Sequence, residues 1–282
     1  MSAPTLPLDS ASDAGHESAA HAIEFQDVHL AFEENQVLRG VSFCLPFGET
    51  KALFGVAGSG KSTILKLALG LLKPDSGRIL VLGNDVTQTR EEDLFALRAR
   101  VGIVFQESAL FDSLNVRENV AYRLIEEHGV ENPDIEHRVR EALQFVELEQ
   151  TIDKFPSELS GGMRRRVAIA RAIITQPEVL LYDSPTGGLD PVTSNTIVEL
   201  IMKQRDVYKT SSLLVTHRLQ DAFTMATHQF DKQTNQMRSL PRGQYCDVPM
   251  SFLILRDGKV IFEGDVRQLA RTKDEYIREY IS

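Results

Sequence analysis

Residues 49–77, ETKALFGVAGSGKSTILKLALGLLKPDSG, combine an apolar strand, a glycine-rich loop and an apolar helix that must end before Pro74. The loop fits the spacing G-x-x-x-x-G-K-[ST], and with this strand and helix around it a chance glycine turn is the weaker interpretation. Glycines let backbone N–H groups turn around phosphate oxygens, and the positive end of the helix dipole faces the same point. We therefore predict a phosphate-binding loop made of Gly55, Val56, Ala57, Gly58, Ser59, Gly60, Lys61, Ser62 and Thr63.

Two side chains of this loop have predicted chemical roles. Lys61 has the length and charge to reach the β- and γ-phosphates of a nucleotide, and Ser62 can offer its hydroxyl to a magnesium ion. The loop therefore predicts ATP or a related nucleotide, with Mg²⁺, as the ligands.

Strands and helices alternate in the second half of the chain, as in EVLLYD, SNTIVELIMKQ and SSLLVTH. This alternation predicts an α/β fold whose mainly parallel sheet is covered on both faces. Near the N-terminus, AIEFQDVHLAF and VLRGVSFCLP read as two half-buried strands and predict an antiparallel β portion. Gly83-Asn84 and Asp257-Gly258 are typical turn sequences.

The chain divides into a leader and one folded domain. Residues 1–21 are rich in Ala, Ser, Asp and Pro without an apolar period, so we expect a disordered leader followed by a domain over residues 22–282. Apolar residues at helical spacing predict a helical subdomain at about 108–160 and a closing helix at about 264–281. Residues 229–248 are polar and aperiodic and predict a long loop.

Composition excludes several functional classes. The net charge is −9 and the pI is about 5.3, which argues against nucleic acid as a partner. Cys44 and Cys246 have no metal-binding or redox spacing, which favours a reducing compartment. The chain has neither a signal-peptide pattern nor an apolar run of the roughly 18 residues that a membrane span needs. We therefore expect a cytoplasmic protein whose membrane role, if any, comes through a partner.

A second phosphate-binding feature lies in LSGGMRRRVAIARA, residues 159–172, where Ser160, Gly161 and Gly162 precede and open a helix. The helix N-terminus attracts an anion, and the two glycines allow a phosphate to approach closely. One chain has no use for two such sites on one phosphate group. Two copies that face each other could use both sites, because each copy would present its serine-glycine turn to the nucleotide held by the other's phosphate loop. This predicts a homodimer in which each copy completes the other's nucleotide site.

With both features in view, the chain from Ile23 to its C-terminus resembles the ATP-binding cassette family, whose nucleotide-binding domains are P-loop NTPases with a RecA-like core. The family's ordered motifs correspond here to Gly55–Thr63, Gln106 (Q-loop), Leu159–Met163 (signature), Val179–Asp183 (Walker B), Gly188–Asp190 (D-loop) and His217 (switch histidine).

The resemblance implies roles for single residues. Asp183 would bind magnesium, Gln106 would contact the metal or the attacking water, and His217 would hold the γ-phosphate. Ser160 would reach the nucleotide of the other copy. Phe32 occupies the position of an aromatic that stacks on adenine, although a single Phe is more often a core residue.

One catalytic position departs from the family pattern. Ser184 stands where the family has the glutamate that orients the attacking water. Losing such a group typically lowers a rate by about two to four orders of magnitude. We therefore expect an ATPase of weakened turnover, and the alternative of a protein that acts mainly by ATP binding stays open.

The segment VFQESALFDSLNVRENVAYRL, residues 104–124, resembles the ATPases of Mla-type phospholipid transporters, which work with MCE-domain proteins. This resemblance implies a membrane permease, an MCE-domain lipid-binding protein and a peripheral location on the inner face of the inner membrane. Three alternatives remain open: Phe111, Leu114 and Val116 as ordinary core, a polar-solute importer of the amino-acid type, and a non-transport cassette protein.

Overall fold

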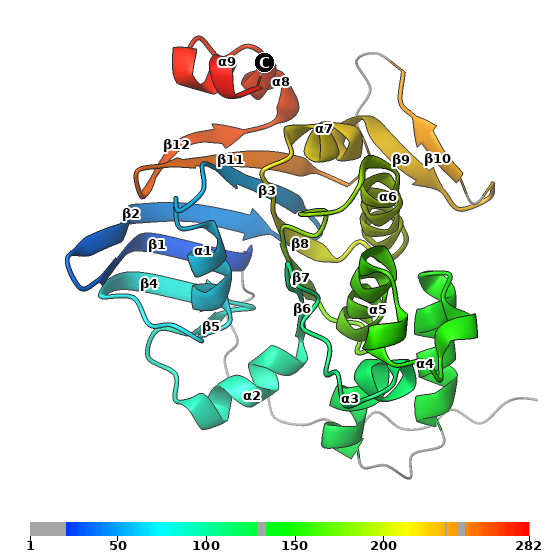
Figure 1. The fold of residues 1–282 in the computed structure, drawn as a ribbon. Helices are drawn as coiled ribbons and strands as arrows, with labels where there is room; N and C mark the ends of the chain where they lie inside the picture. Colours follow the sequence, from blue (N-terminus) through cyan, green and yellow to red (C-terminus); the bar gives the residue numbers. More distant parts are fainter. Residues whose placement is uncertain (1–20, 129–133, 235, 242–245, 247, 282) are drawn as a thin grey trace, which may run out of the picture.

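The computed structural model describes residues 21–128, 134–234, 236–241, 246 and 248–281 (Figure 1). Residues 1–20 lie outside this range, so the predicted leader is described only at its last residue, His21. That residue already belongs to the first strand, where it pairs with Pro46 of the second. His21, which the sequence places in the leader, is therefore part of the first described strand.

A six-stranded sheet in the order β12-β11-β3-β8-β7-β6 crosses the middle of the molecule (Figure 1). Its strands pair in parallel except for β12, which forms a hairpin with β11. Every residue of β3 and β8 is buried, as in a sheet covered on both faces, and the predicted α/β architecture is confirmed. The strands are β3 (Thr50–Gly55), β6 (Val101–Val104), β7 (Val179–Asp183), β8 (Ser211–Val215), β11 (Met250–Arg256) and β12 (Lys259–Gly264).

Alternate side chains of the central strands enter different layers of the core. Leu180 and Tyr182 of β7 pack with the helices α3 to α6, whereas Val179 and Leu181 pack with α1, α2 and the antiparallel sheet. Because β3, β6, β7 and β8 run in parallel, the loops that follow them meet at one edge of the sheet. The helices that begin after β3, β7 and β8 at this edge are α1 (Lys61–Ala68), α6 (Pro191–Tyr208) and α7 (Leu219–Thr227), whereas α2 (Glu91–Ala99) leads into the start of β6.

The N-terminal β portion is a four-stranded antiparallel sheet in the order β2-β1-β4-β5. The expected turn lies one residue earlier than Gly83-Asn84, because Asn84 already pairs with Val81. Leu82 and Gly83 form the two-residue turn, with φ of 49° and 78°, as in the type I′ hairpin that suits strand twist. The strands are β1 (His21–Phe32), β2 (Asn35–Pro46), β4 (Ser76–Val81) and β5 (Asn84–Asp85).

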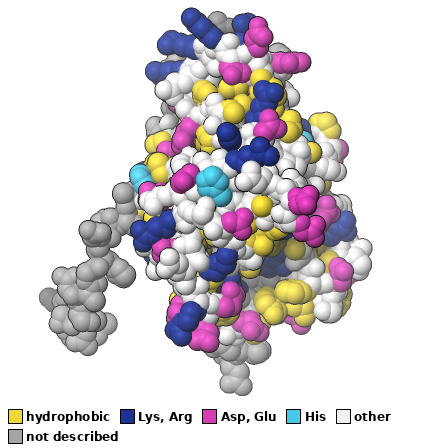
Figure 2. All heavy atoms as spheres, turned by 90° about the vertical axis from the view of Figure 1, so that its left-hand side faces the viewer, with side chains coloured by type: hydrophobic (Ala, Val, Ile, Leu, Met, Phe, Trp, Pro, Cys, Tyr) yellow, Lys and Arg dark blue, Asp and Glu magenta, His cyan; other side chains and the backbone are white. Residues whose placement is uncertain are grey.

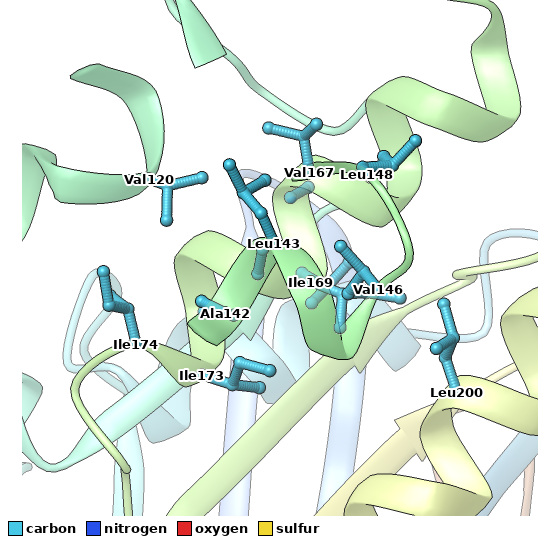
Figure 3. Packing of buried hydrophobic residues seen from close by; sticks show 14 of the residues in the cluster. Val120, Ala142, Leu143, Val146, Leu148, Val167, Ile169, Ile173, Ile174 and Leu200 are labelled. Atoms are coloured by element: carbon cyan, nitrogen blue, oxygen red, sulfur yellow. The ribbon is translucent and has the colours of Figure 1, made fainter. Parts of the chain in front are cut away.

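The span in which a helical subdomain is expected contains two α-helices and two short 3₁₀ turns. Side chains from α3, α4 and α5, among them Val120, Leu143 and Val167, point toward one another in one apolar cluster (Figure 3). The elements are α3 (Val116–His128), α4 (Asp134–Phe145), the turns η1 (Glu149–Thr151) and η2 (Pro156–Glu158), and α5 (Gly161–Ile173), which returns to the parallel sheet.

The prediction of one long loop over residues 229–248 is wrong in its first half, which forms an antiparallel hairpin. Phe230 and Met237 pair across its two strands. One apolar pair is too short a pattern to appear as an alternation in the sequence, which is why the hairpin was not predicted. The buried Asp206 of α6 anchors the hairpin, because its carboxylate accepts the N–H of Phe230 at 2.7 Å. The strands are β9 (His228–Asp231) and β10 (Gln236–Ser239), while residues 242–245 and 247 lie outside the described part.

The prediction of one closing helix at 264–281 is also wrong, because two short helices replace it: α8 (Val266–Ala270) and α9 (Glu275–Ile281). Asp274 accepts the N–H of Ile277 at 3.0 Å and so starts the second helix. The break lets Leu269 and Ile277 both enter the cluster beside β11.

Candidate active site

The predicted phosphate-binding loop connects β3 to α1. A Cβ atom at Gly55 would lie 2.6 Å from the carbonyl oxygen of Leu255, so the neighbouring strand leaves room for glycine alone. Gly60, with φ of 97°, is the N-cap of α1 and has no side chain to cap it, so the first N–H groups of the helix face the loop. The backbone therefore forms the anion cradle that the sequence predicts.

The lysine of the loop is held against this cradle. Its Nζ donates to the carbonyl oxygens of Gly55 and Val56, each at 2.8 Å. Burial lowers the pKa of Lys61, and the negative charge of Asp183 acts in the opposite direction. The loop thus contains a partly desolvated positive charge close to an acidic side chain, where its attraction to phosphate is strong.

Two residues that are 121 positions apart in the sequence meet beside the lysine. Ser62 Oγ donates to Asp183 Oδ1 at 3.1 Å. A hydroxyl and a carboxylate are hard oxygen ligands of the kind that Mg²⁺ prefers, and Mg²⁺ usually keeps several waters and binds substrate phosphates as well. Both side chains face the phosphate loop, so this donor pair fits a magnesium ion bound together with a nucleotide.

A tight turn follows Asp183 at the end of β7. Ser184 is 8% exposed, with φ of 47°, and its N–H donates to the carbonyl of Val215 on β8 at 2.8 Å. Its own carbonyl accepts from Gly187 N–H at 2.9 Å and from Arg165 Nη1 at 3.1 Å. The turn is therefore fixed on both sides, and its side chain is a short hydroxyl in place of a carboxylate.

The predicted Gln106 and His217 lie at the same edge of the sheet. In the parallel β6–β7 pair Val104 is opposite Tyr182, so the loop that carries Gln106 and the turn at Ser184 leave the sheet from neighbouring strand ends. The amide carbon of Gln106 lies 3.7 Å from where a Cβ at Gly187 would be. His217 is exposed two residues after β8, next to the strand end that binds Ser184.

The predicted signature residues form the N-terminus of α5. Ser160 is the N-cap, and its Oγ accepts the N–H of Met163 at 3.2 Å. A Cβ at Gly162 would lie 2.3 Å from a methyl carbon of Thr193 on α6, so this glycine lets two helix starts approach closely. No hydrogen bond among the described residues joins Ser160 to the phosphate loop. Ser160 and Gly161 are exposed, and the surface is available to a second molecule.

The predicted D-loop aspartate has a structural role within this chain. Asp190 is the N-cap of α6 and accepts the N–H groups of Val192 and Thr193, both at 3.0 Å. The hydroxyl and the N–H of Thr193 lower the pKa of Asp190. The carboxylate is thus held ionised at the start of α6, adjacent to the signature helix.

The predicted adenine-stacking residue is exposed. Phe32 is 47% exposed at the end of β1, opposite Asn35 in the hairpin to β2. The strand β2 touches the phosphate loop, since a Cβ at Gly60 would lie 2.8 Å from a methyl carbon of Leu38. Phe32 is therefore a surface aromatic at the end of β1, in the hairpin whose second strand, β2, contacts the phosphate loop. The alternative of a core residue does not hold.

The loop after Gln106 and the helix α3 that follows it each present an exposed aromatic ring. Phe111 and Tyr122, 43% and 40% exposed, lie 4.7 Å apart. The fully buried Asn119 holds the loop, because its amide accepts from Phe111 N–H at 2.8 Å and donates to the carbonyls of Phe111 and Leu114 at 3.0 and 2.9 Å. Arg171 of α5 adds hydrogen bonds to the carbonyls of Ser108 and Ala109.

The sequence reasoning did not single out Arg165 or Asn119. Arg165 lies in the run RRR of the signature helix, whose members are about 100° apart around the axis. The first and third arginines bind the carbonyls of Leu159 and Val146, and the middle one binds Ser184. Burial lowers the pKa of Arg165. The negative charges of Glu107 and, to a smaller extent, Asp183 act in the opposite direction. The helical period on a helix facing the Asp183 strand was a signal that could have identified it.

Comparison with known proteins agrees with this geometry. Residues 38–187 match the model of the family described as "ABC transporter". The chain is similar to the chloroplast protein TRIGALACTOSYLDIACYLGLYCEROL 3 of Arabidopsis thaliana, with 37% identity over 92% of this chain and 72% of the other. It is also similar to the intermembrane phospholipid transport system ATP-binding protein MlaF of Escherichia coli K12, with 30% identity over 94% of this chain and 90% of the other.

A third relative carries a different description. The probable ribonucleotide transport ATP-binding protein mkl of Mycobacterium leprae is 38% identical over 72% of this chain, which spans 59% of that protein. Among solved structures, a dimeric post-hydrolysis state of the ATP-binding cassette MJ0796 with ADP and Pi has a TM-score of 0.72 and 28% identity, and covers 87% of this chain and 99% of its own. The cassette cbiO1 of Clostridium perfringens has a TM-score of 0.73 and 27% identity, and covers 92% and 94%.

In the part of the chain that the structure describes, no helix is both long and apolar enough to span a bilayer. On the face seen in Figure 2, basic and acidic side chains are interspersed.

Proposed function

The chain belongs to the ABC transporter family, and from that premise we propose that it is the ATP-binding subunit of a phospholipid transporter. Two copies bind and hydrolyse ATP beneath an integral membrane permease, and an MCE-domain protein carries the lipid. The chain is peripheral on the inner face of the inner membrane through the permease.

Nucleotide binding rests on one observation, the 3.1 Å contact of Ser62 with Asp183 beside the Lys61 charge. Lys61 and the N–H groups at the start of α1 bind the β- and γ-phosphates. Ser62, Asp183 and Gln106 hold Mg²⁺, which when bound neutralises charge on the phosphate oxygens. His217 contacts the γ-phosphate from the end of β8. Because Ser184 cannot orient water as a carboxylate does, turnover is slower than in a site that has one.

Pairing of two copies follows from the exposed start of α5. Ser160, Gly161 and Gly162 form an anion-binding helix N-terminus with no hydrogen bond to the phosphate loop of their own chain, among the described residues. A second copy supplies the phosphate that this surface fits. The dimeric MJ0796 cassette with ADP and Pi supports the same arrangement.

Contact with the permease rests on the loop after Gln106. Exposed aromatic side chains that lie side by side are typical of interface hot spots. Phe111 and Tyr122 present such a surface, and the buried Asn119 fixes it relative to Gln106 at the nucleotide. Movement of the ATP site can therefore reach a docked partner through a short, rigid segment.

Phospholipid as the cargo rests on likeness in this same segment and on the length of the MlaF match, 90% of that protein. The name of the mkl relative favours a second candidate, a transporter of ribonucleotides or another polar solute. Mass spectrometry of small molecules that co-purify with the assembled complex separates the two. We expect phospholipids, and bound nucleotides or amino acids without lipid would favour the second candidate.

Removing the aromatic surface tests the permease contact. We expect Phe111→Ala with Tyr122→Ala to abolish co-purification of the membrane partner, since a buried aromatic hot spot contributes about 2 kcal/mol or more. MgATP binding by the free chain should not change. Phe47→Ala is the matched control, because Phe47 is equally exposed, at 48%, directly after β2. Retention of the partner by the double variant would contradict the proposed contact surface.

A further inference from the structure

His217 lies between two residues that hydrogen bonds hold in place. Thr216 is 1% exposed, and its N–H donates to the carbonyl of Leu53 on β3 at 3.2 Å. Its hydroxyl accepts the N–H of Arg218 at 3.0 Å, which closes a tight bend around His217. The position of the His217 backbone therefore depends on where Arg218 is held.

The side chain of Arg218 joins two other elements. Its Nη1 donates to the hydroxyl of Ser194, a fully buried residue of α6. Its Nε lies 3.5 Å from Oδ1 of Asp221 in the first turn of α7. The N–H of Ser194 donates to the carbonyl of Asp190 at 2.9 Å, at the start of α6. Arg218 thus connects the segment of His217 to the helix that follows the D-loop.

Asp221 extends this connection to the turn after β7. Its side chain is buried, and Oδ2 accepts the hydroxyl of Thr186 at 2.5 Å, a short bond of the charge-assisted kind. Thr186 is 2% exposed and lies in the turn that the bond from Gly187 N–H to the Ser184 carbonyl closes. A buried carboxylate is costly unless it is both paired and hydrogen-bonded. Asp221 has one partner of each kind, and the two together fix its orientation.

We propose that a positioning network holds His217 at the γ-phosphate of bound ATP. The inference deepens the proposed ATPase function and rests on it. The hydroxyl at the turn orients the carboxylate, the carboxylate and the buried serine hold the guanidinium, and the guanidinium holds the bend. A group that is fixed in advance stabilises charge on a transferring phosphoryl group without reorganisation at the moment of reaction. The network consists of Thr186, Asp221, Arg218 and Ser194.

The test compares the affinities of the full-length native chain and of Thr186→Val for MgATP and for MgADP by isothermal titration. Valine keeps the branched shape of threonine and removes the hydroxyl. We expect the preference for MgATP over MgADP to fall about tenfold, because only ATP carries the γ-phosphate that His217 contacts. Steady-state turnover should fall at least as far. Thr186→Ser, which keeps the hydroxyl, should recover most of both losses.

Two further variants and one control separate positioning from stability. Arg218→Gln, at the partly exposed end of the network, should reproduce the lost preference without a change at the buried end. In a His217→Ala chain, Thr186→Val should lower the preference no further, which a merely structural role would not allow. Thr151→Val is the matched control and should keep the native preference. Thr151 is equally buried, and its hydroxyl donates to the carbonyl of Leu148 in the helical subdomain.

The outcomes separate this network from the proposed function. A native preference in Thr186→Val or Arg218→Gln, or an equal further loss in the His217→Ala chain, would overturn the network while leaving nucleotide binding in place. A native chain that prefers MgATP no more than His217→Ala does would also overturn it. If the native chain does not bind MgATP, the proposed function itself fails.

Discussion

Lys61→Ala is expected to abolish ATP hydrolysis and to weaken MgATP binding about tenfold or more. The lysine is the one positive side chain of the described phosphate loop, and its partly buried charge lies close to Asp183. Charge-assisted hydrogen bonds contribute about 1.5–3 kcal/mol, which corresponds to roughly 10- to 150-fold in affinity. Isothermal titration with MgATP and a phosphate-release assay measure the two effects.

The fold itself should survive this change, because the hydrogen bonds given for Lys61 in the described chain all stay within the loop, to the carbonyls of Gly55 and Val56 and the hydroxyl of Ser59. Lys66→Ala is the matched control, since Lys66 is exposed on the same helix. That variant should bind and hydrolyse ATP as the native chain does. Native affinity in Lys61→Ala would contradict the assignment of residues 55–63 as the nucleotide site.

Ser184→Glu is expected to raise the rate of ATP hydrolysis about 10- to 100-fold. The new carboxylate would extend from a turn that is already fixed by hydrogen bonds to Val215 and Gly187. Arg165 lies against the same turn and offers the positive charge that a partly buried carboxylate needs. The variant therefore gains a water-orienting group without a large electrostatic cost.

The rate is best measured as steady-state turnover at saturating MgATP, for the chain alone and for the complex with its membrane partner. Equal nucleotide affinity in native and variant chains is the control, because position 184 acts on the reaction and not on binding. If the native chain already hydrolyses ATP rapidly and Ser184→Glu lowers that turnover, then Ser184 does not limit the rate of hydrolysis.

Local pattern was sufficient to predict the parallel sheet and the phosphate loop. The strand before Gly55 and the helix after it carry their own signals, so their contact needs no long-range information. The hairpin after His228 could not be predicted in this way, because it depends on Asp206 of a distant helix and on one apolar pair. The split of the closing helix also depends on contacts that the local pattern does not show. Asp274 caps the second helix, and Leu269 and Ile277 each pack in the apolar cluster beside β11.

For the site, the sequence predicted residue types but not which of them meet. The contact of Ser62 with Asp183 joins two motifs 121 positions apart. Only the resemblance to the ATP-binding cassette family, which assigns both residues to magnesium, implied that they meet. The exposure of Phe32 was left open, because the sequence does not show which face of a strand end reaches solvent. Arg165 escaped prediction because its partners are backbone carbonyls, which leave no motif, and only its place in the helical period of the RRR run pointed to it.

In the proposed mechanism, nucleotide closes two copies of the chain over two shared sites. Light scattering of the native full-length chain with MgATP tests it most directly, against the mass of 31.5 kDa for one copy. We predict twice this mass with MgATP, the single mass when EDTA removes magnesium, and the single mass for Ser160→Arg with MgATP. A native chain that stays at the mass of one copy while saturated with MgATP would contradict the account.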